Sequence, residues 1–214
     1  MSENRKRIYC AGPLFTEKER EEMALIASAL ENVGYATFLP QRDGLELSKC
    51  VECLVHNGTP PDEAGMLMSR AIFALDVYQV LRGCDALVAN LNGRVPDEGT
   101  VSEAAMAWAH GKRVVGYKAD SRTAFDGQDN PLVAGLFAFS LCQSIEELPE
   151  AVKHCFASQR SADSAREDRK REINEYMELG EKLSATMERN RGIEEVIEIV
   201  LRFQSSAPVP SVAS

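Results

Sequence analysis

The sequence predicts an α/β domain built on a doubly wound parallel sheet of about five strands, with a charged helical segment appended at its C-terminal end. The first observation is that short β-branched and aromatic runs alternate with amphipathic helical runs from Arg7 to Ala157. The second is the change at Gln159, after which charged residues dominate. Such alternation predicts a sheet covered on both faces, with ligands bound beyond the carboxyl ends of its strands.

The first elements form a predicted βαβ unit. The run Arg7–Ala11 (RIYCA) has the length and apolar character of a buried strand. Thr16, followed three residues later by Glu19, matches the capping box that opens a helix. Gly34 provides a left-handed stop, and the aromatic and β-branched run Tyr35–Leu39 predicts the second strand.

The next segment carries many turn signals. Asp-Gly, Asn-Gly and Pro-Pro pairs in Pro40–Pro61 predict a long loop with one short helix between Leu45 and Leu54. Loops of this length in compact domains usually have a function. Helical periodicity resumes over Asp62–Leu81, and Asp85–Leu91 is the predicted third strand.

The alternation continues to the end of the predicted domain, with glycine stops and β-branched runs as before. The expected elements are a turn-rich loop (Asn92–Gly99), a helix (Thr100–His110), a fourth strand (Arg113–Tyr117), a loop (Lys118–Pro131), a fifth strand (Leu136–Leu141) and a helix interrupted by Pro149 (Ser144–Ala157).

Three regions follow from these patterns: a single domain over 1–158, a helical appendage over 159–203 and a disordered tail over 204–214. A polar helix with a thin apolar stripe buries too little alone to stay ordered, so we expect the appendage to mediate assembly. A solvated helix without a partner is the alternative. The apolar stripe consists of Ile173, Tyr176, Met177, Gly180, Leu183 and Met187.

The charge balance limits the partners. The chain has 24 Lys and Arg residues against 33 Asp and Glu residues, a formal net charge of -9. Without a basic excess it cannot release counterions from phosphates, so we expect no nucleic-acid partner. We find no apolar run of signal-peptide length at the N-terminus and none approaching the roughly 20 residues of a membrane span, which predicts a cytoplasmic protein without membrane contact.

The six cysteines are expected to be reduced thiols, because no export signal accompanies them. Cys50-Val-Glu-Cys53 with His56 nearby has the spacing of half a zinc site. A structural zinc site needs a second ligand pair at matching spacing, and none follows. We therefore expect no metal and no cofactor.

Four carboxylates gather around the predicted third strand: Asp76, Asp85, Asp97 and Glu103. Asp85 starts the strand and should lie at the sheet edge opposite any ligand, so no catalytic role is expected. Asp76 has apolar sequence neighbours, and burial would raise its pKa and suit it to act as a general acid. An exposed Asp76 paired with Arg70 is an equal alternative.

Asp97 and Glu103 lie where a loop runs into a helix beyond the third strand, which is where this type of sheet binds ligands. A structural explanation of Glu103 is also available. Thr100-Val-Ser-Glu103 fits the capping-box template, in which Glu103 would satisfy a backbone donor. From the pattern alone the capping role is favoured.

An ordered set of motifs resembles the nucleoside 2-deoxyribosyltransferase family from Arg7 to about Ala157. The resemblance implies a flavodoxin-like fold and does not extend to the appendage from Gln159 onward. The motifs are Tyr9-Cys-Ala-Gly-Pro-Leu-Phe15, Phe38-Leu-Pro-Gln-Arg-Asp-Gly44, Asp76, and Asp97-x-Gly-x-x-x-Glu103 followed by Gly111-Lys112.

The resemblance also implies roles for the matching residues. Glu103 would attack the anomeric carbon of the sugar, Tyr9 would orient that carboxylate, and Asp76 would protonate the departing base. The implied substrate-binding residues are Asp97 and Gly12, Asn130 from an adjacent subunit of a homo-oligomer for the 5′-hydroxyl, and Gln41, Arg42 and Asp43 near the base.

The implied reaction moves a 2-deoxyribosyl group from a deoxynucleoside to a free nucleobase. A carboxylate attacks an oxocarbenium-like centre and forms a glycosyl-enzyme ester, which the second base resolves with net retention. Water can replace the second base, so slow hydrolysis should accompany transfer. The preference for purines or pyrimidines would depend on the shape of the segment Pro40–Pro61.

Two other functions stay open. A 2′-deoxynucleoside 5′-monophosphate N-glycosidase resembles this family in fold and nucleophile, but tends to have a hydroxyl residue at the position of Asp97 and a Ser- and Arg-containing loop after the first strand. Ala11-Gly-Pro-Leu-Phe15 contains neither residue type. A non-catalytic nucleotide sensor is the third candidate, because a fold alone does not establish chemistry.

Overall fold

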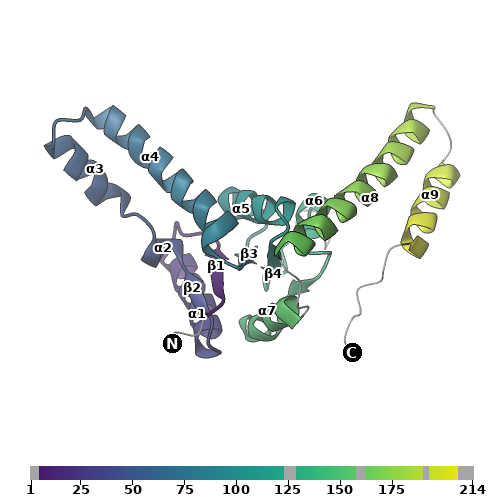
Figure 1. Cartoon of the computed structure of the whole chain (residues 1–214), viewed down its shortest axis with the longest axis horizontal. Coiled ribbons are helices and arrows are strands. Elements are labelled where there is room, and N and C mark those ends of the chain that lie inside the picture. The colour runs from purple at the N-terminus through teal and green to yellow at the C-terminus, as the bar shows by residue number, and fades with distance from the viewer. Residues whose placement is uncertain (1–4, 123–128, 158–161, 190–192, 207–214) are drawn as a thin grey trace. The chain divides into compact units, whose positions relative to one another are not determined.

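The computed structural model describes residues 5–122, 129–157, 162–189 and 193–206. The chain divides into two compact units, Met1–Ala165 and Arg166–Ser214. The first unit holds the sheet and the helices that cover it, and the second is a pair of helices (Figure 1).

The sheet of the first unit has five parallel strands in the order β2-β1-β3-β4-β5. This is the flavodoxin-like order, so the predicted fold class is confirmed. The chain moves outward from β1 to β2 and then returns past β1 to β3, which makes the carboxyl ends of β1 and β3 the place where such sheets bind ligands. The strands are β1 (Arg7–Ala11), β2 (Ala36–Phe38), β3 (Ala86–Asn90), β4 (Arg113–Tyr117) and β5 (Leu141–Cys142).

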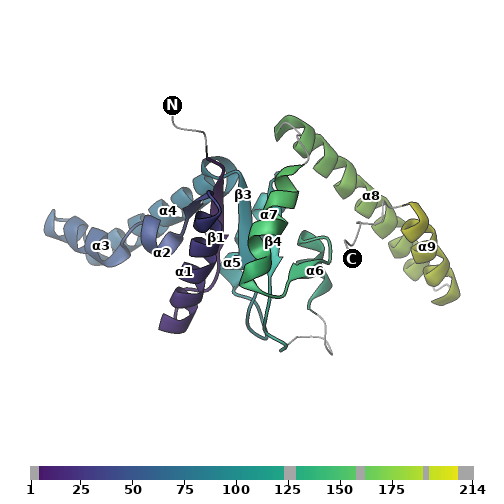
Figure 2. The same cartoon turned by 90° about the horizontal axis from the view of Figure 1, so that it is seen from below.

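Helices cover both faces of the sheet, and alternate side chains of each strand face opposite layers. In β1, Ile8 and Cys10 pack against α1 and α7, whereas Tyr9 and Ala11 lie in the layer with α5. Figure 2 shows α1 and α7 together in front of the strands. The bounds are α1 (Glu17–Asn32), α5 (Glu98–Ala109), α6 (Pro131–Leu136) and α7 (Leu148–Ala157).

Helix α1 begins and ends as the sequence predicts. The Thr16 hydroxyl accepts from the Glu19 amide at 3.2 Å, and the Thr16 amide donates to the Glu19 carboxylate at 2.7 Å, which completes the capping box. Gly34 has φ of 98°, a left-handed conformation that favours glycine after a helix.

The segment Pro40–Pro61 contains the predicted short helix, but it is helical over most of its length, so the expected long loop was wrong. It forms α2 (Pro40–Asp43) and α3 (Leu47–His56), and Pro61 begins α4 (Pro61–Tyr78). Pro40 and Pro61 both occupy the first turn of a helix, where proline has no amide hydrogen to lose and its fixed φ suits the helix. The prolines therefore start helices here instead of ending them.

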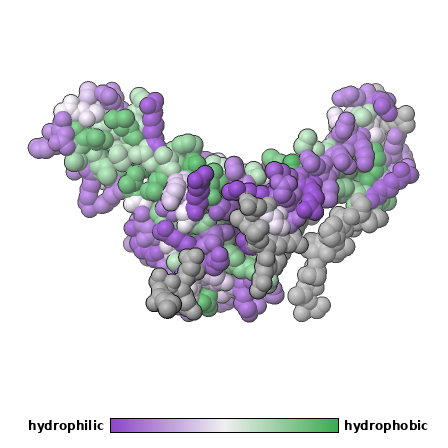
Figure 3. Space-filling view, viewed as in Figure 1, coloured by the Kyte–Doolittle hydropathy of each residue, from purple (hydrophilic) through white to green (hydrophobic). Residues whose placement is uncertain are grey.

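Helix α4 continues into a π-helical turn, η1 (Gln79–Gly83). By length and composition alone, Pro61–Gly83 is long and apolar enough to cross a membrane. The sequence analysis had expected no segment of this kind. Its last turns belong to the core of this unit, because Val80 is buried against the sheet. Leu67 and Phe73 of α4 are exposed. Figure 3 shows a green, hydrophobic surface over α3 and α4.

The predicted fifth strand was misplaced. The predicted strand began at Leu136, but this residue is the last one of α6 (Pro131–Leu136). Strand β5 comprises only Leu141–Cys142. Asn130 caps α6 by accepting from the Leu132 amide at 2.9 Å, so the Asn-Pro pair starts a helix. Ala138 and Phe139 follow with positive φ of 51° and 59°, which no strand adopts.

The predicted helix over Ser144–Ala157 also differs in detail. A 3-10 turn, η2 (Ile145–Glu147), precedes α7, and Pro149 falls in the first turn of α7, so it does not interrupt the helix.

The second unit comprises α9 (Ile193–Ser206) and all but the first four residues of α8 (Ala162–Glu188), in agreement with a helical appendage. Helix α9 extends three residues beyond the expected end at Phe203, so 204–206 are not part of a tail. The remainder of the predicted disordered tail, 207–214, lies outside the described residues.

Candidate active site

Tyr9 is fixed in the middle of β1 by aromatic stacking. Its side chain is fully buried, and its ring lies 5.5 Å from that of Phe38 with an interplanar angle of 22°. The Arg7 guanidinium lies 5.3 Å from the other ring, that of Phe38. The sequence analysis did not predict that Phe38 holds the Tyr9 ring. The two residues are paired across the adjacent parallel strands β1 and β2, a register that the structure provides.

The Tyr9 hydroxyl lies between two carboxylates that come from different helices. It donates to Glu103 Oε1 on α5 at 2.6 Å, and it lies 3.3 Å from Asp76 Oδ1 in the last turn of α4. A hydroxyl has only one proton to donate, and the shorter distance assigns it to Glu103. Residues predicted from three separate motifs are thus brought together in one cluster.

Burial raises the pKa values of all three groups. For Glu103, desolvation raises the pKa from 4.5 to about 7, the Tyr9 hydrogen bond opposes this rise, and the charges of Asp76 and Asp97 add to it. Burial also raises the pKa of Asp76. The pKa of Tyr9 is raised by burial and by the neighbouring carboxylates, so its phenol stays protonated and remains a donor. The cluster therefore disfavours simultaneous ionisation of both carboxyl groups.

Asp97 caps the helix that carries Glu103. Its Oδ2 accepts from the Thr100 amide at 2.7 Å and from the Thr100 hydroxyl at 2.8 Å. Helix α5 therefore starts at Glu98, and Glu103 lies more than one turn inside it. The capping-box explanation of Glu103 was wrong, because Asp97 takes the cap and the Glu103 carboxylate is bonded to Tyr9.

The other two carboxylates near β3 are separated by the fold. Asp76 is half-buried and meets the Tyr9 hydroxyl, which favours the site over the alternative of an exposed helix face. Asp85 accepts from the Arg7 amide at 2.9 Å and from Lys6 Nζ at 3.0 Å, at the amino edge of the sheet. Asp85 thus lies where the sequence placed it, away from the cluster around Tyr9.

The three residues expected near the base lie in α2, directly after β2. Asp43 accepts from the Leu39 amide at 2.9 Å, and Arg42 pairs with both Asp43 and Glu31 at 2.9 Å. Gln41 donates to a backbone carbonyl of α1 at 2.8 Å. These bonds hold α2 against its neighbours at the carboxyl edge, and each of the three side chains is engaged in them.

Gly12 and Asn130 also have roles in the local structure. A Cβ added to Gly12 would lie 2.1 Å from Met23 Sδ and 3.1 Å from Asn90 Cβ, so β1 can end here only with glycine or with a shift of its neighbours. Asn130 is exposed, and its side chain caps α6 as described above.

Sequence reasoning missed a polar network at the carboxyl edge. Asn90 is fully buried at the end of β3 and donates to Glu22 on α1 at 2.9 Å, and Asn92 donates to the same carboxylate at 2.8 Å. The available signal in the sequence was the position of Asn90 and Asn92, at the end of an apolar strand and two residues beyond it. Glu22 and Asn92 line a hollow of about 400 Å³ at this edge, together with Pro13, Gly93, Asp120 and Arg122 among others.

The described part of the chain contains no group of three or more His, Cys, Asp or Glu side chains arranged to hold a metal ion. The six cysteines are free thiols. The two carboxyl groups and the phenol of the cluster are capable of nucleophilic attack, proton donation and hydrogen bonding.

Comparisons with known proteins indicate the family to which the chain belongs. A family profile described as "Nucleoside 2-deoxyribosyltransferase" matches residues 8–174. A conserved protein from Enterococcus faecalis V583 has a similar structure, with a TM-score of 0.54 and 25% identity over 70% of this chain and 98% of that one. None of the curated proteins matches the chain.

Two solved 2-deoxyribosyltransferases also resemble the chain. The enzyme from Bacillus psychrosaccharolyticus gives a TM-score of 0.52 at 17% identity over 67% of this chain and 90% of that one. The enzyme from Leishmania mexicana gives a TM-score of 0.48 at 20% identity, over 70% and 98% of the two chains. At 17% identity, the likeness to the Bacillus psychrosaccharolyticus enzyme concerns the fold alone. The profile, which spans most of the chain and includes Tyr9, Asp76 and Glu103, shows that the protein belongs to the nucleoside 2-deoxyribosyltransferase family.

Proposed function

We propose that the protein transfers the 2-deoxyribosyl group between nucleobases through a covalent intermediate on Glu103. The observation that carries the proposal is the 2.6 Å hydrogen bond from the Tyr9 hydroxyl to Glu103, with Asp76 3.3 Å from the same hydroxyl. Family membership supports a nucleoside as the substrate.

In the first step, a Glu103 oxygen attacks the anomeric carbon and the bond from that carbon to the base breaks. The electron pair of the broken bond leaves with the base, and Asp76 supplies the proton that neutralises it. The product is a glycosyl ester of Glu103, formed through an oxocarbenium-like transition state.

In the second step, an acceptor base attacks the same carbon and the ester bond breaks. Two displacements at one carbon give net retention. The acceptor gives up its proton to the Asp76 carboxylate, which restores the starting state. Water can take the place of the acceptor, so slow hydrolysis accompanies transfer.

The distances in the cluster are compatible with the protonation state that these two steps need. When Asp76 is protonated, it donates to the Tyr9 oxygen while Tyr9 donates to an ionised Glu103. In this arrangement of hydrogen bonds, the negative charge lies on Glu103 and the proton lies on Asp76. Burial raises the pKa of Asp76, which is the direction that favours a role as a proton donor to the leaving base.

The substrate-binding residues extend the proposal to the carboxyl edge of the sheet. Asp97 would accept from a sugar hydroxyl through the oxygen that does not cap α5, and Gly12 would let the substrate approach β1 closely. Asn130 would act from a second copy of the chain in a homo-oligomer, and α2 would lie beside the base.

The test is incubation of the purified protein with deoxyinosine and free adenine. We expect deoxyadenosine to form, and Glu103→Ala to abolish nearly all of it. Release of hypoxanthine alone would instead indicate an N-glycosidase, and no reaction would support a nucleotide sensor. A 2-fluoro sugar substrate should add its mass to the peptide that contains Glu103; labelling elsewhere would contradict the proposed nucleophile.

A further inference from the structure

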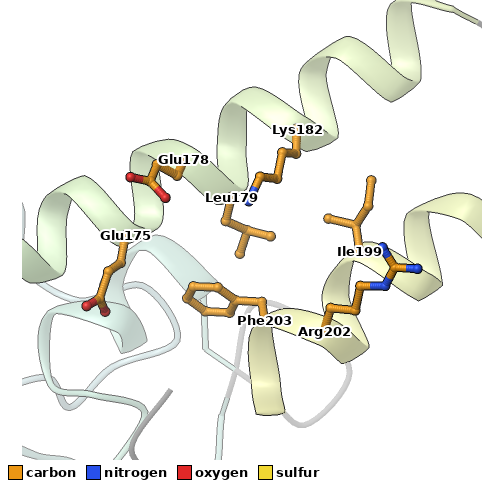
Figure 4. Close-up of a pocket in the computed structure, with 7 residues that line it drawn as sticks. All are labelled: Glu175, Glu178, Leu179, Lys182, Ile199, Arg202 and Phe203. Carbon is orange, nitrogen blue, oxygen red and sulfur yellow. The ribbon is translucent and has the colours of Figure 1, made fainter. Parts of the chain in front are cut away.

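The second unit presents apolar surface that its own two helices do not cover. Helix α9 runs back along α8 (Figure 1). The centroids of the Tyr176 and Phe203 rings lie 5.8 Å apart. Leu179 and Phe203 point toward one another across a hollow of about 350 Å³ between the helices (Figure 4). This is the inner, shared face of the hairpin, and it uses only one side of each helix.

Helix α9 has a second apolar face that remains exposed. Ile193, Ile197, Val200 and Leu201 recur at the spacing of one helix face, and their exposed fractions run from 46% to 69%. The inner contacts of α9 come from Ile199 and Phe203, which lie on a different side of the helix. An amphipathic helix of 14 residues that needed only α8 as a partner would have polar residues on this outer face.

Helix α8 has a matching outer stripe. Ile173, Met177, Gly180, Ser184 and Met187 are spaced alternately by four and three residues, the pattern of a helix that packs along another helix. Met177 is 65% exposed and Met187 is 70% exposed. Nothing lies within 4 Å of a Cβ built on Gly180, so no contact in the described structure explains a helix-weakening glycine at the centre of the stripe.

We infer that these outer faces bind the same hairpin of a second copy of this chain, so that two hairpins form a bundle of four helices. The size is appropriate: six large side chains, each about half exposed or more, offer on the order of 500 Å² of apolar surface. With their polar rim they approach the roughly 800 Å² that each partner buries in a stable interface.

The charges favour a second copy as the partner. From Arg166 to Ser206 there are eight basic and ten acidic residues, so the hairpin is nearly neutral within a chain of net charge -9. Four of the basic residues lie in Arg166–Arg171, and eight of the acidic ones lie in Glu172–Glu198. An antiparallel arrangement therefore brings the basic start of one α8 near the acidic part of its partner, which lowers repulsion between copies.

This surface is independent of the proposed chemistry, because the family profile ends at residue 174 and most of both stripes follows it. Light scattering of the full chain without substrate is the test. Ile197→Asp should halve the mass of the wild-type particle, because it puts a charge into the apolar interface. The matched control, Asn174→Asp, adds the same charge at an exposed polar position of α8 and should leave the mass unchanged.

Gly180→Leu provides a second variant that cannot fail through loss of helix. Leucine favours a helix more than glycine does, so a hairpin without a partner would become more stable and keep its mass. If the stripe packs against a second copy, the larger side chain blocks close approach and the mass halves. Wild-type mass in both Ile197→Asp and Gly180→Leu would overturn the inference, as would a wild-type particle that is already a monomer.

Discussion

The single proton of the Tyr9 hydroxyl links the two carboxyl groups of the cluster. Because it is donated over 2.6 Å to Glu103, it stabilises the ionised form of Glu103, the proposed nucleophile, and the Tyr9 oxygen remains available to accept from a protonated Asp76. Phe38 holds this ring from β2, so the orientation of the hydroxyl depends on a residue that touches neither carboxylate. Two predictions follow from this arrangement.

Tyr9→Phe should change the pH dependence of transfer. Glu103 must be ionised to attack, and its pKa is raised to about 7, so kcat/KM should increase with pH through that value. The Tyr9 hydrogen bond lowers the pKa of Glu103, and removing it should shift this limb to higher pH. The variant should therefore lose more activity at pH 6 than at pH 9. Equal loss at both would mean that Tyr9 only supports packing.

Glu103→Gln should be inactive but more stable than the wild type at pH 8. Burial raises the pKa of Glu103 from 4.5 to about 7, so the folded state holds this proton more tightly than the unfolded state does. The wild-type free energy of unfolding then falls as the pH rises from about 4.5 to about 7, by on the order of 3 kcal/mol at most. Glutamine has no such dependence.

Urea unfolding of both proteins at pH 5 and pH 8 measures this difference. The advantage of Glu103→Gln should be present at pH 8 and nearly absent at pH 5. An equal difference at the two pH values would show that the carboxyl group is not buried as described.

At the scale of elements, the residue that caps α5 is also the one proposed to select the substrate. Asp97 Oδ2 caps the helix, while the carboxylate as a whole lies at the carboxyl edge where the sugar is proposed to bind. A carboxylate within about 4 Å of a phosphate repels it by roughly 4 kcal/mol at an effective dielectric near 20. Asp97 should therefore make the enzyme prefer nucleosides to their 5′-monophosphates.

Asp97→Ser tests this preference with little change to the helix, because serine is also a good N-cap. The ratio of kcat/KM for deoxyadenosine over its 5′-monophosphate should fall at least tenfold. Asp97→Ala is the control for stability, since it should lose about 1 kcal/mol through the missing cap. A wild-type enzyme that already prefers the monophosphate would contradict the prediction.

Elements were predictable from the sequence where local signals act alone. Hydrophobic periodicity, together with capping and turn residues, predicted the capping box of α1 and the buried strands β1, β3 and β4. The same signals predicted the order of strands and helices. The failures all involve proline or a positive φ: Pro40 and Pro61 begin helices, and the turn at Ala138 and Phe139 replaces the expected strand. A proline marks a helix boundary, but it does not show whether the helix precedes or follows it.

The site was harder to predict because its residues are brought together by tertiary structure. The spacing of Thr100 and Glu103 indicates a capping box, and only the fold shows that Asp97 takes the cap and leaves Glu103 for Tyr9. The network of Glu22, Asn90 and Asn92 also depends on how α1 lies against β3. The family resemblance supplied the membership of the cluster, whereas its hydrogen bonds and electrostatics required the structure.

At the scale of the whole molecule, chemistry and assembly are assigned to different units. Tyr9, Asp76 and Glu103 all lie within Met1–Ala165, and the exposed stripes of α8 and α9 lie within Arg166–Ser214. If the division is functional, the two properties should separate on truncation.

A chain that ends at Ala165 should keep the ability to transfer 2-deoxyribose while its particle mass falls. Its sheet, both core layers and all three residues of the cluster are retained, so kcat per site should stay within about threefold of the full chain, a change of less than 1 kcal/mol. Light scattering should show fewer copies per particle, matching full-length Ile197→Asp. A truncated protein that still unfolds cooperatively but loses transfer would show that the appendage contributes to the site. One that keeps the full number of copies would place assembly in the first unit, where the exposed side chains of α3 and α4 offer another apolar surface.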